Sequence, residues 1–409
     1  MPRLVNATPP SHPPDVTTHD TGMTVRCQIS PRFLTEVGMN ANQITREGLG
    51  QDREFRCLDE CDDDSLMRPS SGPSTQRILP EVIMRPSRKW LLLAGAVVMS
   101  CVLSVPSAAN ASPSAQPRAH LLVSALDGSL GSTVGPDGAL YVAEGVAGQI
   151  SRIDPRNGHR SIFASGLPKR IAPVGGPMDV AFIGHTAYVL VSVVSPDVGG
   201  SGVYGIYRVD GPQSFTVIAD IGAFSLAHPP NTSFFIPTGV QFAMQPYRAG
   251  FLVTDGHHNR VLRVKLNGDI SEVIAFPDIV PSGLALRGKT VYMTEAGPVP
   301  HLPENGKIVA FTTRSPAARV VASGAPLLVD VEFGHGHSMY ALSQGHFTPG
   351  HPEGSPADPD TGALERVNKD GTMTPIATGL NQPTSLEIIG HTAYIVTLTG
   401  DVWAIRLSR

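Results

Sequence analysis

Between residues 118 and 409, short runs of alternating apolar and polar residues are separated by turns rich in Gly, Pro, Asn and Asp. Such alternation over four to eight residues is typical of β-strands with one buried face. The hexamer Ile-Gly-His-Thr-Ala-Tyr at 183–188 recurs letter for letter at 389–394. Looser copies occupy 135–141, 238–254, 287–292 and 334–340. Their spacing of roughly 44 to 60 residues is in or somewhat above the range of four-stranded propeller blades. Six copies predict six blades.

Each unit contains four short apolar segments, which we call strands A to D in chain order. In the third unit we expect these strands at 238–242, 250–254, 260–265 and 270–276. The last unit supplies only three, at 385–389, 393–397 and 402–407, whereas a lone strand at 120–124 precedes the first unit. We therefore predict an all-β, six-bladed β-propeller in which the N-terminal strand completes the C-terminal blade and removes an exposed sheet edge.

Residues 84–111 have the parts of a signal peptide. Arg85, Arg88 and Lys89 precede an apolar run at 90–105, and Ala-Asn-Ala follows at 109–111. At 1.5 Å per residue that run falls short of a ~30 Å hydrocarbon core, which argues against an uncleaved anchor. A lipoprotein site at Cys101 is less consistent, because apolar residues continue beyond it. We expect a mature chain from Ser112, secreted to an extracellular or periplasmic location, without stable membrane insertion after cleavage.

Residues 1–83 are rich in Pro, Ser, Asp and Arg and have no convincing period. They are either a disordered extension or the product of a start assigned upstream of Met84. The four cysteines, Cys27, Cys57, Cys61 and Cys101, all precede Ser112. A mature protein covering 112–409 would therefore have no disulfide, thiolate metal site or cysteine nucleophile.

Composition supports a large β-domain, with 41% hydrophobic and 16% charged residues and with 42 Gly and 37 Pro for turns. The formal net charge of −4 provides no basic surface for nucleic acid or for an anionic membrane. We expect no nucleic-acid partner.

Connection lengths distinguish the two faces of the predicted ring. In an up-and-down blade the A–B and C–D turns lie on one face, and the B–C and D–A loops lie on the other. The long segments are 165–177, 195–204, 221–237, 296–306 and 344–362, and all are B–C or D–A loops. We call their side the long-loop face and the opposite side the tight-turn face. Long ordered loops on a rigid scaffold usually bind ligands, so we expect binding on the long-loop face.

Histidines and aromatic residues of the long-loop face are the candidates for contacting a ligand. Those on tight turns, including His185, His335, His337 and His391, are expected to be solvated turn residues. The predicted ligand-binding residues are Tyr204, Phe224, Phe234, His257, His258, His301, His346 and His351.

Three acids, Glu144, Asp255 and Glu295, end B strands with similar local sequences. Directed at one channel mouth, they could hold Ca²⁺, which takes six to eight oxygen ligands. The alternative is that each caps its own turn by accepting hydrogen bonds from nearby backbone N–H groups. Calcium is therefore the candidate cofactor, and the site would be Glu144, Asp255 and Glu295.

Several motifs resemble the ScyD/ScyE family of secreted proteins, over roughly residues 118–409. They are Gly-Pro-Asp-Gly-Ala-Leu-Tyr-Val-Ala-Glu at 135–144, Thr-Asp-Gly at 254–256, Asn-Arg-Val-Leu-Arg-Val at 259–264, and Ala-Thr-Gly-Leu at 377–380. The resemblance implies a six-bladed, TolB-like β-propeller. It supplies no catalytic residues.

The sequence favours an exported binding module for a small molecule, a glycan or an extracytoplasmic protein. The alternative is a calcium-dependent lactonase-like hydrolase, which the six-bladed fold also resembles. Starts of A strands at 176–177, 237–238, 281–282 and 383–384 contain no acid, unlike the pattern such enzymes need, and no Gly-x-Ser-x-Gly elbow occurs. A fold alone dictates no reaction, so catalysis and a purely structural role both stay open.

Overall fold

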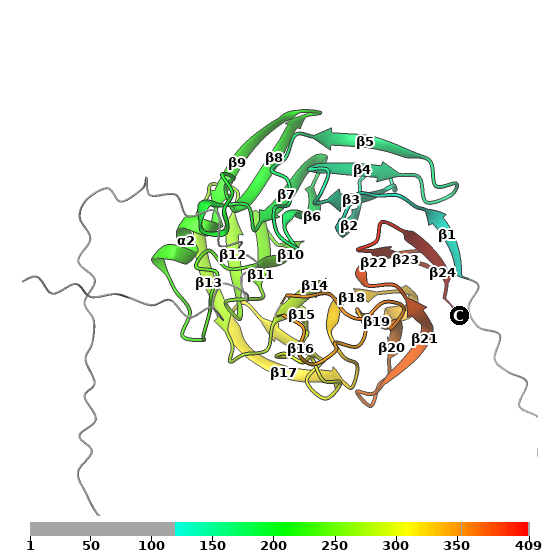
Figure 1. Cartoon of the computed structure of the whole chain (residues 1–409). Helices are drawn as coiled ribbons and strands as arrows, with labels where there is room; N and C mark the ends of the chain where they lie inside the picture. The colour runs from blue at the N-terminus through cyan, green and yellow to red at the C-terminus, as the bar shows by residue number, and fades with distance from the viewer. Residues whose placement is uncertain (1–118, 353, 408–409) are drawn as a thin grey trace, which may run out of the picture. The chain divides into compact units, whose positions relative to one another are not determined.

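The computed structural model describes residues 119–352 and 354–407, which form six four-stranded antiparallel sheets arranged in a ring (Figure 1). This confirms the predicted six-bladed β-propeller. The segments assigned to an extension (1–83) and a signal peptide (84–111) lie outside the described residues. Within the described part of the chain, no helix is long and apolar enough to cross a membrane.

In each blade the first strand lies nearest the axis and the last lies at the rim (Figure 1). Blades 1 to 3 follow the chain order. Blade 1 contains β2 (Ser129–Val134), β3 (Leu140–Glu144), β4 (Gln149–Ile153) and β5 (Arg160–Ser165). Blade 2 contains β6 (Gly176–Ile183), β7 (Thr186–Ser192), β8 (Gly205–Gly211) and β9 (Ser214–Asp220). Blade 3 contains β10 (Gln241–Pro246), β11 (Gly250–Asp255), β12 (Arg260–Lys265) and β13 (Ile270–Ala275).

Blades 4 and 5 continue this order, and blade 6 closes the ring. Blade 4 contains β14 (Pro281–Arg287), β15 (Thr290–Glu295), β16 (Lys307–Thr312) and β17 (Ser315–Ser323). Blade 5 contains β18 (Leu328–Phe333), β19 (Met339–Ser343), β20 (Gly362–Val367) and β21 (Met373–Leu380). Blade 6 contains β22 (Pro383–Ile389), β23 (Thr392–Thr397), β24 (Val402–Arg406) and the N-terminal strand β1 (Ala119–Val123).

Strand β1 pairs antiparallel with β24, with Ala119 opposite Ile405 and Val123 opposite Val402. In Figure 1 the first coloured strand lies beside the red C-terminal blade. The predicted closure of blade 6 by the N-terminal strand is therefore confirmed, and it leaves no unpaired edge on β24.

Apolar side chains pack between neighbouring blades rather than along the axis. Between blades 2 and 3, Leu190 and Ile206 pack with Phe251 and Leu262, all fully buried. Second strands such as β3 are buried along their whole length, because both of their faces are covered, whereas rim strands such as β5 are mostly half-buried or exposed. Each such buried Leu, Ile or Phe contributes about 1.5–3 kcal/mol, which makes inter-blade packing the main source of stability.

The repeated hexamer forms the A–B hairpins of blades 2 and 6. Each hairpin has a two-residue loop, Gly184-His185 or Gly390-His391, between its strands. Gly184 and Gly390 have φ of 62° and 63°, the left-handed region that a type II′ turn needs at its first central residue. The sequence recurs because this turn geometry recurs.

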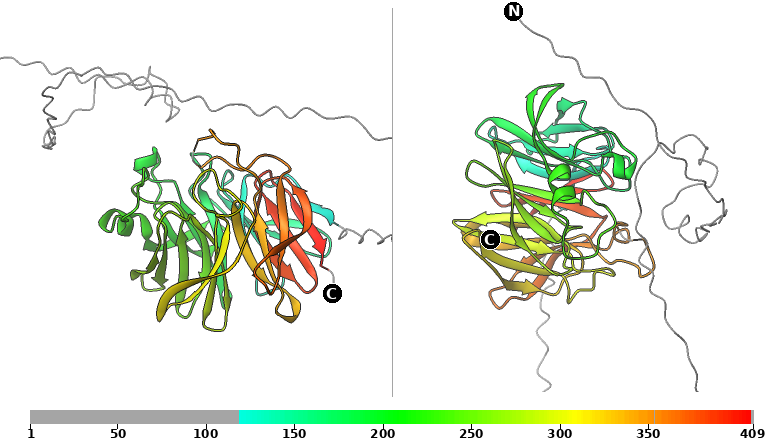
Figure 2. Two further views of the ribbon diagram at one scale, coloured as in Figure 1. Left: turned by 90° about the horizontal axis from the view of Figure 1, so that it is seen from below. Right: turned by 90° about the vertical axis from the view of Figure 1, so that its left-hand side faces the viewer.

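All five long connections leave the same side of the ring. They are 166–175, 193–204, 221–240, 296–306 and 344–361. They include a short 3-10 helix, η2 (Pro196–Val198), and one α-helix, α2 (Ile221–Ala227). In the left-hand view of Figure 2, the orange loop before β20 rises from the side opposite the C-terminal end of β24. Tight turns, including the 3-10 turn η3 (His335–His337), lie on the other side.

One strand differs from its prediction. The first strand of blade 3 is β10 at Gln241–Pro246, not 238–242. Gly239 has a φ of 79°, and the backbone N–H of Val240 donates to the Asp255 carboxylate at 3.1 Å. Residues 238–240 are therefore held as a turn by the end of β11 before the strand begins.

Candidate functional site

A buried charge network occupies the long-loop end of blade 3. Asp255, the last residue of β11, is fully buried, and its carboxylate lies 3.2 Å from His258 Nδ1 and 3.4 Å from Arg260 Nε. Burial alone would raise the pKa of Asp255, but its interactions with His258 and Arg260 outweigh burial and lower it. The carboxylate is thereby kept ionised inside the protein.

Arg260 connects this network to the loop above it. The side chain is 1% exposed, and it donates from Nη1 to the carbonyl of His228 at 2.7 Å and from Nη2 to Ser225 Oγ at 2.9 Å. Ser225 belongs to α2 and His228 caps its C-terminal end. One buried guanidinium therefore attaches α2 to blade 3.

Aromatic and imidazole rings cover this network. Phe224 stacks on His228 with ring centroids 4.3 Å apart, Phe234 lies edge-on to His258 at 5.3 Å, and Phe235 lies edge-on to His257 at 4.3 Å. We call these residues, with Leu226, the blade-3 cluster. It brings together four predicted ligand-binding residues, namely Phe224, Phe234, His257 and His258.

His257 holds the loop that carries the two exposed rings. Its Nε2 accepts hydrogen bonds from the backbone N–H groups of Phe235 at 2.9 Å and Ile236 at 3.0 Å. Burial lowers the pKa of His257 to about 4. The imidazole is therefore neutral at neutral pH, the state in which Nε2 can accept.

Tyr204 is one of three predicted ligand-binding residues that are buried, together with His258 and His301. Its side chain is 1% exposed, and its carbonyl accepts the N–H of Ile221 at the start of α2 at 2.9 Å. Burial raises the pKa of Tyr204 to about 12. Tyr204 lies in the interior next to α2 and supports the loop from within.

A second group forms on the loops of blades 4 and 5. His301 Nδ1 lies 2.6 Å from the carbonyl of Gly297, and its ring is edge-on to Phe347 with centroids 5.2 Å apart. The Phe347 ring also lies edge-on to that of His351, with centroids 5.9 Å apart. His346 is exposed beside them, with its N–H donating to Thr361 Oγ1 at 3.0 Å. Burial lowers the pKa of His301.

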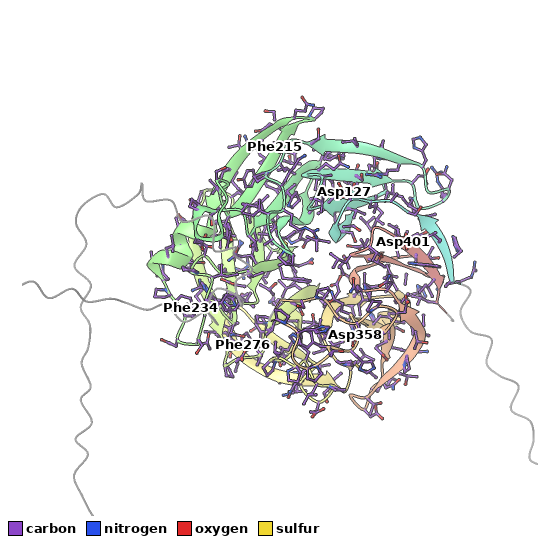
Figure 3. All side chains as sticks on the ribbon, viewed as in Figure 1. Asp127, Phe215, Phe234, Phe276, Asp358 and Asp401 are labelled. Carbon is purple, nitrogen blue, oxygen red and sulfur yellow. The ribbon has the colours of Figure 1, made fainter. Side chains whose placement is uncertain are left out.

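Apart from Tyr204, the predicted ligand-binding residues thus form two groups and not one. The blade-3 cluster and the group around Phe347 come from different blades, and Figure 3, which labels Phe234 and Asp358 of the two regions, shows them at different positions round the ring. A small ligand would contact one group, whereas a larger partner could contact both.

The three acids predicted to bind calcium occupy three blades. Glu144 accepts from Arg160 Nη2 at 2.9 Å, from the N–H of Asp127 at 2.6 Å, and from Ser151 Oγ. Asp255 is engaged by Arg260 as described above. Glu295 is 5% exposed, and burial raises its pKa to about 7 against the opposing charge of Lys307.

Within residues 119–352 and 354–407, no three His, Cys, Asp or Glu side chains are grouped in a way that could hold a metal ion. Two of the three candidate carboxylates are already neutralised by buried or half-buried arginines. Calcium binding at Glu144, Asp255 and Glu295 stays a prediction.

Sequence reasoning missed a cavity of about 290 Å³ on the propeller axis. The first strands of all six blades line it, and four carboxyl groups border it: Asp179, Asp330, Glu332 and Glu387. We call these four the axial carboxyls and the space the axial cavity. A repeated sequence, Asp-Val-x-Phe at 179–182 and 330–333, was a signal that could have located two of them.

Two of the axial carboxyls join neighbouring blades in the same way. Asp179 of blade 2 accepts the N–H of Met244 in blade 3 at 2.7 Å, and Asp330 of blade 5 accepts that of Leu386 in blade 6 at 2.8 Å. A Cβ on Gly131 would overlap the first carboxyl, and one on Gly283 the second. Glycine is therefore needed at both positions, and the arrangement recurs halfway round the ring.

Comparisons with known proteins support the fold alone. No protein-family model and no curated protein matches the chain. Among solved structures, a gluconolactonase from Xanthomonas campestris is similar with a TM-score of 0.50 and 14% identity, over 71% of this chain and 90% of that one. A virginiamycin B lyase from Staphylococcus aureus is similar with a TM-score of 0.45 and 14% identity, over 71% of this chain and 99% of that one. The likeness to the gluconolactonase is consistent with a six-bladed propeller.

Proposed function

We propose that this protein is an exported binding module of the ScyD/ScyE type, which recognises a small aromatic molecule, a glycan or an extracytoplasmic protein through its long-loop face. The secretion motif at 84–111 and the blade motifs at 135–144 and 259–264 support export and the family assignment. The long loops supply the recognition surface.

The distribution of exposed apolar side chains carries this proposal. In the described part of the chain, the large hydrophobic residues that are exposed on long loops are Ile171, Leu226, Phe234, Phe235, Val299 and Leu302. The others, Leu121, Ile162, Val217 and Val320, lie on rim strands. None lies in a described tight turn. One face of the ring is therefore much more apolar at its surface than the other.

The blade-3 cluster is the most developed part of this surface. Phe234 and Phe235 are 41% and 61% exposed, and Leu226 is 59% exposed. Exposed aromatic rings held in fixed positions bind partners well, because little side-chain freedom is lost on binding. The buried network of Asp255, His258 and Arg260 supplies this rigidity from below.

The alternative is a calcium-dependent hydrolase related in fold to gluconolactonases. Such an enzyme would need carboxylates that are available to a cation, and here Glu144 and Asp255 are engaged by Arg160 and Arg260. Binding is therefore the function that the geometry supports better. Measuring bound metal in the purified protein, and its melting with chelator and with added Ca²⁺, would test the alternative directly.

The proposal is tested with phenyl β-glucoside, a probe that combines an aromatic ring with a sugar. Saturation-transfer NMR on the full chain should detect binding, and the double variant Phe234→Ala/Phe235→Ala should weaken it at least about fivefold. The matched control Ile162→Ala/Val217→Ala removes exposed apolar residues from rim strands and should bind like the unaltered protein. Equal loss in both variants, or no transfer at all, would contradict binding of small aromatic glycosides at this cluster.

A further inference from the structure

The axial cavity is bordered by acidic groups without any compensating positive charge. Strand by strand, β6 contributes Asp179, β18 contributes Asp330 and Glu332, and β22 contributes Glu387. The lining residues of β2, β10 and β14 include no titratable side chain. Among the described residues that line this cavity, none is a Lys, Arg or His.

The four axial carboxyls differ in the number of hydrogen bonds that hold them. Asp179 and Asp330 each accept two backbone N–H groups at 2.7–2.8 Å. Glu332 accepts the N–H of Phe333 at 3.2 Å. Glu387 makes no hydrogen bond to another described residue. Two carboxyls are therefore part of the joints between blades, and two extend into the cavity.

Burial and mutual repulsion act on these groups together. Burial raises the pKa of Asp330 to about 7 and, with the added repulsion of Asp330, raises that of Glu332 to about 8. The pKa of Glu387 lies well above its ordinary value, because of burial and then the charges of Glu332, Asp330 and Asp179. Carboxyls that share one site cannot all ionise near neutral pH, so they titrate as a set.

We propose that the axial carboxyls form a pH-sensitive element, which keeps the propeller ring tightly joined while they share protons and loosens it as they ionise. The element is built into the inner strands, and Asp179 and Asp330 connect it to the joints between blades 2 and 3 and between blades 5 and 6. It does not depend on what the long-loop face binds.

The direction of the effect follows from proton linkage. The unfolded chain releases the protons of Asp and Glu near pH 4, their ordinary value, whereas the folded protein retains those of Asp330 and Glu332 up to about pH 7 and about pH 8. The pKa values of Asp179 and Glu387 are raised in the same direction. Between those limits the folded state binds more protons. The contribution of these carboxyls to the stability of the folded state is therefore fully present below about pH 4 and is lost as pH rises through 7 and 8.

Other groups titrate in the same range and must be separated from this effect. His257 and His301, whose pKa values are lowered, act in the opposite direction below their ordinary value. Glu295 and Glu365, whose pKa values burial raises, act in the same direction as the axial carboxyls. A comparison of variants, and not a single pH profile, isolates the axial set.

The experiment measures the melting temperature of the full chain from pH 5.5 to pH 8.5. The unaltered protein should lose roughly 5 °C or more over this range. Glu387→Gln removes the carboxyl that is repelled by all three of the others. This variant should melt at a clearly higher temperature than the unaltered protein at pH 8.5. At pH 5.5 the two melting temperatures should agree within about 1 °C. The control Glu304→Gln removes an exposed carboxyl of the 296–306 loop and should follow the unaltered protein.

Two results would overturn the proposal. If Glu387→Gln had the same slope with pH as Glu304→Gln, the axial carboxyls would not be the sensitive groups. If Glu387→Gln lost more melting temperature between pH 5.5 and pH 8.5 than the unaltered protein, ionisation of the axial carboxyls would stabilise the ring instead of loosening it. Glu332→Gln is measured in parallel, so that a folding defect in one variant does not remove the test.

Discussion

The two faces of this propeller are made from the same repeat, yet they differ in how their connections are stabilised. On the tight-turn face, connections run from two residues, as at 184–185, to six, as at 154–159, and most of their backbone hydrogen bonds close within the turn. On the long-loop face, segments such as 221–240 need distant partners, and Arg260 reaches α2 from another strand. Exposed apolar side chains occur on the second face and not in the described turns of the first.

This difference shows how a repeat fold separates structural stability from recognition. A short hairpin satisfies the hydrogen bonds of its backbone within a few residues, so its side chains contribute little to holding the turn. A long loop must be fixed by buried polar contacts, after which its apolar side chains can stay exposed in fixed positions. The buried acidic groups differ in the same way. Asp255, which supports the loop, is paired with Arg260, whereas the axial carboxyls have no cation among the described lining residues.

The largest expected effect is the loss of the buried guanidinium. Arg260→Met should leave the buried Asp255 carboxylate without its guanidinium partner and should cost about 3–5 kcal/mol in urea unfolding. It should also release α2, because Ser225 and the His228 carbonyl lose their donor. The matched control is Arg208→Met, which removes an exposed ion pair with Asp210 near a tight turn and should leave stability unchanged within error. Similar losses in both variants would remove the distinction between the faces.

A smaller effect is expected from His257→Ala. The N–H groups of Phe235 and Ile236 lose their acceptor, which should cost about 1–2 kcal/mol, concentrated in the loop before β10. Amide hydrogen exchange should become faster at 232–238 and stay unchanged in the β11–β12 hairpin. Unchanged exchange at 232–238 would show that the imidazole does not hold the loop.

The smallest effect concerns the repeated hexamer. Gly184→Ala places a Cβ on a residue with φ of 62°, where the surroundings are open, and should cost about 1 kcal/mol from backbone strain alone. His185→Ala in the same turn should leave thermal stability and phenyl glucoside binding unchanged. A loss of binding in His185→Ala would show that the tight-turn face takes part in recognition.

The blade frame could be predicted from sequence because it depends on local alternation and on turn residues. Counting strands was enough to predict that β1 completes blade 6. The start of β10 was placed three residues too early, because the alternating stretch Thr-Gly-Val-Gln-Phe at 238–242 does not reveal that Asp255 holds Val240 in a turn.

The candidate site was predicted only in part, and for a different reason. Phe234 belongs to a long loop, so loop length located it. His257 lies in the short turn between β11 and β12, and it was located by the face on which that turn lies. Arg260 was assigned to a strand without a role, because its partners on α2 are distant in sequence. Asp179 and Asp330 stand between apolar neighbours, and nothing in that pattern states that the first strands enclose a cavity.

The most direct test of recognition by the long-loop face is amide hydrogen exchange over the whole protein, with and without saturating phenyl β-glucoside. We predict that the ligand slows exchange at 221–240 and 256–259 and leaves exchange unchanged at the hairpins 184–185, 288–289 and 390–391. Protection confined to those hairpins, or spread equally over both faces, would contradict the assignment of recognition to the long loops.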